Sequence, residues 1–131
     1  MLAERDLMNR DGPGVVLALP DADRAAAVAD RLRRRGWRVI RATTGTEARK
    51  LACRHLPDAV VLPADGPVES GWLTAAKLLR AQPRLRVVLV GERTGSAARF
   101  ARFLGATLAP ADAGAAELAA RVAGAVPQVV G

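Results

Sequence analysis

In this chain of 131 residues, the side chains best suited to form a chemical site are carboxylates, which could bind a metal ion. Five of them follow short apolar runs that are typical of buried strands: Asp21, Asp23, Asp65, Glu69 and Asp112. If those runs form one parallel sheet, these side chains lie near its carboxyl edge, and their oxygens are the ligands that Mg²⁺ and Ca²⁺ prefer. Asp21 and Asp23 are equally well placed to cap a helix, and Asp65 and Glu69 stand among turn residues. Because a hard cation needs several converging oxygens, we expect no metal site.

Nucleophilic catalysis has no better support. Cys53 and His55 are the only cysteine and histidine, and no serine, cysteine or aspartate stands at a recognisable spacing from His55. A lone cysteine cannot form an internal disulfide, and we interpret Cys53 as a small buried hydrophobic residue. The glycines form neither a dinucleotide-binding nor a phosphate-binding motif. We therefore expect no enzymatic activity and no cofactor.

The composition is that of one ordinary globular domain. Half of the residues are hydrophobic and 25% are charged, which is enough to bury a core. No apolar run has the length of a membrane span, and the polar start lacks a secretion signal. We expect a cytoplasmic protein without a membrane partner. We divide it into a flexible N-terminal segment (1–13), one domain (14–126) and a C-terminal tail (127–131).

The hydrophobic pattern predicts an α/β fold with a parallel sheet, because short apolar runs alternate with longer segments of helical period. The five predicted strands are 15–19, 37–41, 58–62, 86–90 and 106–109. The second of them alternates polar and apolar residues, as an edge strand does. The helices between them are expected to bury these residues: Ala25, Val28, Ala29 and Leu32; Ala48, Leu51 and Ala52; Leu73, Ala76 and Leu79; Phe100, Ala101 and Leu104; Leu118, Ala119 and Val122.

This order of elements resembles the receiver domain of bacterial response regulators (CheY-like) over roughly residues 14 to 126. The residues that carry the resemblance are Gly36-Trp37, Pro57-Asp58, Pro67, Gly71, Gly105-Ala106 and the stretch from Glu117-Leu118 to Arg121-Val122. The resemblance implies a doubly wound, flavodoxin-like sheet of five strands in the order 2-1-3-4-5. These residues are mostly structural, so they say more about the fold than about chemistry.

The family transfers a phosphoryl group to an aspartate after the third strand, using Mg²⁺ held by an acidic pair after the first. A Thr or Ser after the fourth strand and a Lys after the fifth bind the phosphate. Counted back from Gly36, the acidic pair falls at Leu19 and Pro20, and counted on from Pro57, the acceptor falls at Pro63. The hydroxyl position after the fourth strand holds Gly91. The lysine position falls within 109–111, which reads Ala-Pro-Ala. The resemblance is therefore to a degenerate pseudo-receiver that does not accept phosphate.

The predicted fourth helix carries both phenylalanines of the chain among arginines: Arg99, Phe100, Arg102 and Phe103. Receiver domains commonly dimerise or dock partners through the fourth helix, fifth strand and fifth helix. By resemblance, this face is the expected surface for another signalling protein or for a homodimer. Phe103 is either exposed on it or a second core residue, and the sequence leaves both readings open.

Positive charge is concentrated between residues 24 and 54. This stretch has ten basic and two acidic residues, a net charge of +8, whereas the other hundred residues have a net charge of −1. We predict that these residues form a patch on one side of the domain that faces an anionic partner. The second strand contributes Arg38 and Arg41, which we expect on one face of that strand. The full patch comprises Arg31, Arg34, Arg35, Arg38 and Arg41. A merely solvated arginine surface is the alternative.

Together these patterns favour a phosphorylation-independent pseudo-receiver that acts as a protein-interaction module in bacterial signal transduction or regulation. One alternative is a small basic protein that associates with nucleic acid through the Arg24–Arg54 patch, although 3% aromatic residues leave little for base stacking. The other is a sensor that binds a small ligand at the apolar carboxyl edge around Leu19, Pro20 and Pro63.

Overall fold

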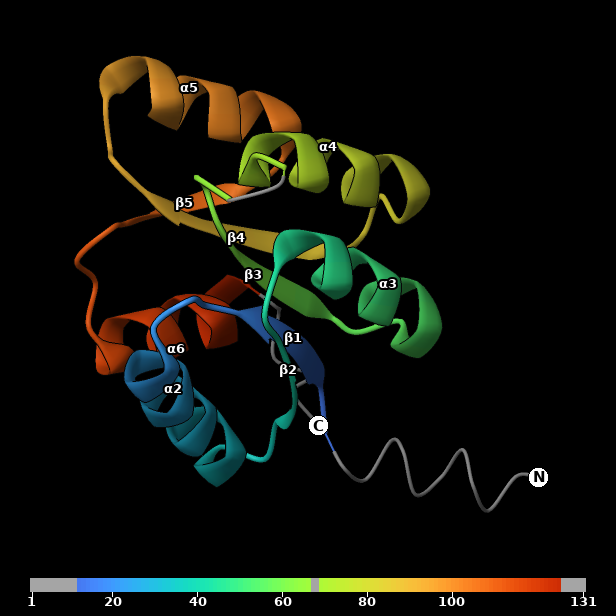
Figure 1. Cartoon of the computed structure of the whole chain (residues 1–131), viewed down its shortest axis with the longest axis vertical. Coiled ribbons are helices and arrows are strands. Elements are labelled where there is room, and N and C mark those ends of the chain that lie inside the picture. Colours follow the sequence, from blue (N-terminus) through green and yellow to red (C-terminus); the bar gives the residue numbers. More distant parts are fainter. Residues whose placement is uncertain (1–11, 67–68, 126–131) are drawn as a thin grey trace.

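The computed structural model describes residues 12–66 and 69–125. In this part of the chain the strands are β1 (Gly14–Ala18), β2 (Arg38–Ala42), β3 (Ala59–Pro63), β4 (Arg86–Gly91) and β5 (Thr107–Pro110). The helices are α2 (Ala22–Arg34), α3 (Gly45–His55), α4 (Gly71–Ala81), α5 (Gly95–Leu104) and α6 (Ala115–Ala125) (Figure 1). The predicted N-terminal segment, up to residue 11, and the predicted tail 127–131 lie outside the described residues.

All strands of the described residues form one parallel sheet in the order β2-β1-β3-β4-β5. The predicted fold class and strand order are therefore confirmed, and β2 is an edge strand as its alternating pattern indicated. The strand bounds differ from prediction by about one residue. In particular, β1 ends at Ala18, which places Leu19 in the connection that follows the strand.

Helices cover both faces of the sheet. Figure 1 shows α2 and α6 on one face and α3, α4 and α5 on the other. Because side chains alternate along a strand, Val15 and Leu17 of β1 belong to the core under α2 and α6, whereas Val16 belongs to the core under the other three helices. Burying each such Val or Leu side chain contributes about 1.5–3 kcal/mol to the stability of the fold. The two cores therefore hold the helices against both faces of the sheet.

Four helices begin at a side chain that accepts a hydrogen bond from their first free N–H groups. These N-terminal caps are Asp21, Thr44, Ser70 and Thr94. Each cap replaces a partner that the first helical turn lacks, which stabilises the helix by about 1 kcal/mol. The caps fix where each helix begins, at the carboxyl edge of the sheet.

The buried face of α4 differs from the predicted one. Thr74 is fully buried together with Ala75 and Leu78, whereas Leu73 is half exposed. The other two residues of the predicted face, 76 and 79, are only partly buried. A threonine tolerates this core position because its hydroxyl donates to Glu69 and also lies 3.2 Å from the carbonyl oxygen of Ser70. The spacing of the leucines therefore predicted the wrong buried face for α4.

Cys53 is exposed on α3 rather than buried. The inner stripe of this helix is formed by Ala48 and Ala52, with Leu51 packed beside them. Cys53 follows Ala52 directly, and a step of one residue turns a side chain by about 100° around a helix. It therefore faces solvent, and its interpretation as a buried hydrophobic residue is wrong.

Candidate functional site

The four positions that would carry receiver chemistry lie at the carboxyl edge of the sheet. Pro63 is the last residue of β3, and Gly91 is the last residue of the neighbouring strand β4. Leu19 follows β1 and is 4% exposed, as part of the core, and Pro20 beside it is exposed. None of the four side chains carries a carboxylate or a hydroxyl group. The arrangement lacks both a phosphoryl acceptor and ligands for a hard cation.

The space between β3 and β4 at this edge is filled by Ala64. A Cβ atom on Gly91 would lie 2.6 Å from the Cβ atom of Ala64, whose side chain is itself buried. The N–H of Ala64 donates to the carbonyl oxygen of Val90 at 2.9 Å, and its carbonyl oxygen accepts from the N–H of Gly71 at 2.8 Å. The loop after β3 is thus fastened onto β4, and the edge has no room for a hydroxyl-bearing side chain at position 91.

Two of the five carboxylates near this edge have other partners, whereas Asp23, Asp65 and Asp112 are exposed. Asp21 accepts from backbone N–H groups as the cap of α2. Glu69 forms an ion pair with Lys77 at 2.7 Å and accepts a hydrogen bond from Thr74. The bond from Lys77, followed by that from Thr74, holds the pKa of Glu69 below its ordinary value. Within residues 12–66 and 69–125, no three His, Cys, Asp or Glu side chains converge as a metal site requires.

A positively charged side chain lies at the end of β5. It belongs to helix α2, whereas the lysine of the resembling family follows the fifth strand itself. Arg24 of α2 donates from Nη1 to the carbonyl oxygens of Ala111 at 2.8 Å and Ala113 at 2.9 Å. These bonds hold the loop between β5 and α6 against α2. Arg24 is therefore a structural residue, and its guanidinium is not part of a free basic surface.

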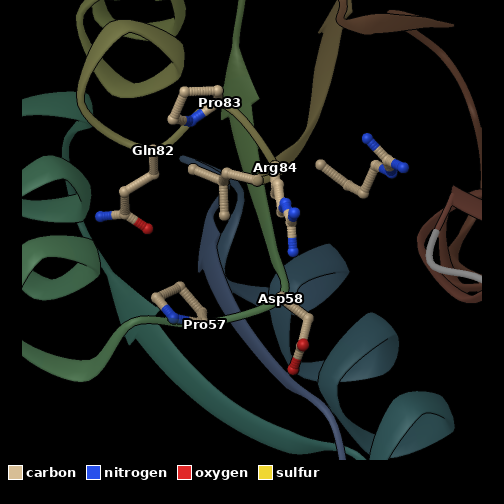
Figure 2. Close-up of a pocket in the computed structure, with 7 residues that line it drawn as sticks. Pro57, Asp58, Gln82, Pro83 and Arg84 are labelled. Carbon is tan, nitrogen blue, oxygen red and sulfur yellow. The ribbon is translucent and has the colours of Figure 1, made fainter.

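Two shallow hollows lie at opposite ends of the sheet. The first, about 400 Å³, is at the carboxyl edge where the ligand-sensor alternative places its site, and it is lined by Leu19, Pro20, Ala22, Arg41, Ala42 and Thr43. The second, about 520 Å³, is at the amino edge (Figure 2). Its Asp58 accepts from the N–H of Gly14 at 2.8 Å, and its Gln82 donates to the carbonyl oxygen of Ala52 at 3.2 Å. Asp58 and Gln82 therefore have structural roles, and Arg84 and Arg86 also line this hollow.

Three of the four aromatic side chains gather across α4 and α5. The ring centroid of Phe100 lies 5.3 Å from that of Trp72 and 6.4 Å from that of Phe103. Phe100 is 47% exposed and Phe103 is 83% exposed, whereas Ala101 is the buried residue of α5. The prediction that Phe100 is a core residue is therefore wrong. Of the two readings left open for Phe103, the exposed one is correct.

These rings lie on the α4 side of α5, not on the expected side toward β5 and α6. Figure 1 shows α4 and α5 next to each other over the same face of the sheet. Between them is a shallow apolar hollow of about 430 Å³ lined by Trp72, Ser96, Ala97 and Phe100. We call the residues Trp72, Phe100 and Phe103 the aromatic row. Trp72 was not singled out in the sequence because its contact partner is 28 residues away along the chain.

The helices that carry the aromatic row have no acidic residue. They carry four basic residues instead: Lys77, Arg80, Arg99 and Arg102. Over residues 71–111 there are seven basic residues and a single acid, Glu92. The net charge of −1 summed over all residues outside 24–54 concealed this second basic region. Five of the eleven acids in that sum lie before residue 24, and they offset the positive charge of residues 71–111. A charge count along a sliding window would have found it.

The predicted arginine patch does not form one surface. Arg38 and Arg41 lie three residues apart in β2, and side chains in a strand alternate with a period of two, so these two face opposite sides of the sheet. Arg41 donates to the carbonyl oxygen of Ala22 of α2, whereas Arg38 donates to that of Gly12, both at 3.4 Å. The exposed Arg31, Arg34 and Arg35 lie on and just after α2, and the basic residues of α3 lie on the opposite face of the sheet.

The sequence matches no protein-family model and no curated protein. Solved structures do match. The chemotaxis protein CheY4 of Vibrio cholerae is 16% identical, with a TM-score of 0.77 over 87% of this chain and 98% of that one. The receiver domain of RstA from Klebsiella pneumoniae is 22% identical, with a TM-score of 0.74 over 88% and 99%. A redox sensor of the streptococci, from a family that evolved from two-component response regulators, is 17% identical, with a TM-score of 0.76 over 87% and 51%. The chain thus has the fold of response regulator receiver domains.

Within the described residues, no helix has the length and apolar character needed to cross a membrane.

Proposed function

We propose that this protein is a phosphorylation-independent pseudo-receiver and that it acts as a protein-interaction module in signal transduction or regulation in the bacterial cytoplasm. The observation that carries the proposal is the contact of Ala64 with Gly91 beside Pro63, where the resembling family has its phosphorylation site. We further propose that it has no enzymatic activity and uses no cofactor or metal.

Phosphoryl transfer needs a nucleophile and positive charge that stabilises the transferred group. Proline at position 63 has no nucleophilic atom in its side chain, and Leu19 and Pro20 offer no oxygen ligand for Mg²⁺. A side chain on Gly91 would collide with Ala64. These replacements act on every part of the reaction at once, which supports loss of the chemistry rather than a change of substrate.

The similar structures support a regulatory role for the fold. Two of them are a chemotaxis protein and an activated receiver domain, and the third is a redox sensor whose family evolved from response regulators. The last case supports the idea that this fold also serves in regulation outside the original phosphotransfer scheme.

The aromatic row supports an interaction role. Large exposed apolar side chains that cluster on a monomer typically mark a surface that another molecule covers. The apolar area of Phe103 is left in water when the chain is alone, and covering such a side chain contributes about 1.5–3 kcal/mol. The basic residues that were expected to bind nucleic acid are divided between the two faces of the sheet, which favours the protein-interaction reading.

The proposal is tested by capture of partners from the native cell with the tagged protein. We expect a protein that is retained equally well with and without acetyl phosphate and after nuclease treatment, and that is lost with Phe103→Arg. The matched control is Leu56→Arg, because Leu56 is also an exposed apolar residue, 68% exposed, but lies at the end of α3. Capture that requires acetyl phosphate, that disappears with nuclease or that is indifferent to Phe103→Arg contradicts the proposal.

A further inference from the structure

Resting on the proposed interaction function, we infer that the aromatic row binds an acidic amphipathic helix of a partner protein. The rings are assembled before any partner arrives, since Phe100 contacts both Trp72 and Phe103. Preassembly lowers the ordering cost of binding, and aromatic and arginine residues dominate the binding energy of protein interfaces. The row is therefore built to act as an anchor.

The spacing of the row fits a helix. Side chains three or four residues apart on a helix lie about 5–6 Å from each other, and the successive ring centroids of the row are 5.3 and 6.4 Å apart. The hollow beside Trp72 and Ala97 lies between two helices and is mostly apolar. An amphipathic helix that places large apolar side chains at such intervals is the usual ligand of a groove of this kind.

The charge around the row selects an acidic ligand. Of the four basic residues on α4 and α5, Lys77 is paired with Glu69. Arg80, Arg99 and Arg102 are exposed and have no acidic partner among the described residues. A ligand with Asp or Glu beside its apolar stripe satisfies these arginines, whereas a basic ligand is repelled.

The same charge argues against a second copy of this chain. A two-fold symmetric dimer packs one surface patch against the same patch of the second copy. Through this face it would bring the basic residues of α4 and α5 against those of the second copy, and neither helix has an acidic residue to compensate them. The homodimer expected from the family resemblance is therefore disfavoured at this surface.

Single-stranded nucleic acid also combines negative charge with flat rings, but it fits the row less well. Base stacking requires aromatic faces that are free on at least one side for successive bases. The planes of Phe100 and Phe103 are within 16° of each other and already pack together, and Phe100 also meets Trp72. Only Phe103 is largely exposed, so the row offers one platform rather than a series.

The test is a binding titration with two fluorescein-labelled helical peptides. Both carry leucines at positions i, i+3, i+4 and i+7; one has glutamates on the flanking positions and the other has lysines. We expect the glutamate peptide to bind the full chain and the lysine peptide not to bind. Affinity for the glutamate peptide should fall about tenfold or more with Phe103→Ala and with the double variant Arg99→Glu and Arg102→Glu, and should weaken as salt rises.

The control variant is Leu56→Ala, which removes an exposed apolar side chain outside the row and should leave peptide affinity unchanged. Equal binding of the two peptides, no binding of either, no effect of Phe103→Ala, or stronger binding of an oligothymidylate than of the glutamate peptide overturns the inference. So does a dimer in sedimentation that Phe103→Ala dissociates. If the partner capture proposed above succeeds while the glutamate peptide fails, the partner chemistry is wrong and the interaction function stands.

Discussion

The methyl group of Ala64 occupies the space that any side chain on Gly91 would need. The two Cβ positions would be 2.6 Å apart, far closer than two carbon atoms approach without a bond. Ala64 cannot simply move away, because its N–H and carbonyl groups bind Val90 and Gly71. A tight backbone arrangement therefore closes the end of β3 and β4, where the resembling family keeps a hydroxyl group and an aspartate.

The first prediction concerns this contact. Gly91→Ala should destabilise the fold by about 1–3 kcal/mol because it overpacks a closed site. The double variant with Ala64→Gly should recover most of that loss, as measured by urea unfolding. Gly95→Ala is the control, since a Cβ there meets nothing within 4 Å and the residue is the first of α5; it should change stability by less than about 0.5 kcal/mol. A harmless Gly91→Ala, or a loss that persists in the double variant, would contradict the packing described.

A second prediction concerns Arg24, which joins α2 to the loop after β5. Arg24→Ala should cost about 1–3 kcal/mol in the free energy of unfolding, because it removes two hydrogen bonds from a charged donor. Hydrogen exchange should rise in the loop 111–114. Arg31→Ala on the same helix, whose side chain is exposed, should change stability by less than about 0.5 kcal/mol. Equal effects of the two substitutions would argue against a structural role for Arg24.

A third prediction follows from Leu56, which ends α3 with φ at +49°. This left-handed conformation costs a residue with a Cβ about 1–2 kcal/mol, and glycine avoids the cost. Leu56 buries little side-chain area, so Leu56→Gly should raise the free energy of unfolding by about 0.5–1 kcal/mol. Ala76→Gly, in the interior of α4, should instead lower it by about 1 kcal/mol. A loss of stability in both variants would show that Leu56 does more than end the helix.

A fourth prediction concerns pH. The pKa of Glu69 is lowered in the folded state, first by Lys77 and then by Thr74. Its contribution to stability is therefore fully present above the ordinary value of about 4.5 and is lost as the pH falls through the lower folded-state pKa. The stability difference between the wild type and Thr74→Val should shrink over that acidic range. In a Glu69→Gln background the same difference should not vary with pH, and a pH-independent difference in both backgrounds would contradict the coupling.

The order of elements was predictable because the buried strands are apolar runs and four helices of the described residues begin at a side chain that caps them. The cap Asp21 was among the residues proposed for that role. The edge position of β2 followed from its alternating pattern. Local signals therefore sufficed for the fold, since neighbouring residues in the chain decide strand, cap and turn.

Several predictions were wrong at residues whose burial or orientation depends on partners that are distant in the sequence. Thr74 is tolerated at a core position because Glu69 satisfies its hydroxyl. Phe100 lies outside the core and contacts Trp72 of another helix. The shared face predicted for Arg38 and Arg41 ignored the two-residue period of a strand. The Ala64 contact with Gly91 depends on how a loop folds back over a strand, which no spacing of residue types reveals.

The most direct test of the central claim is the intact mass of the protein after incubation with acetyl phosphate and Mg²⁺, beside an active receiver domain treated in the same way. The account predicts that the active domain gains a phosphoryl group and that this chain does not. Because Asp65, two residues after Pro63, is the carboxylate nearest to it in the sequence, Asp65→Asn is the informative variant. A stoichiometric gain of one phosphoryl group that Asp65→Asn abolishes would contradict the account.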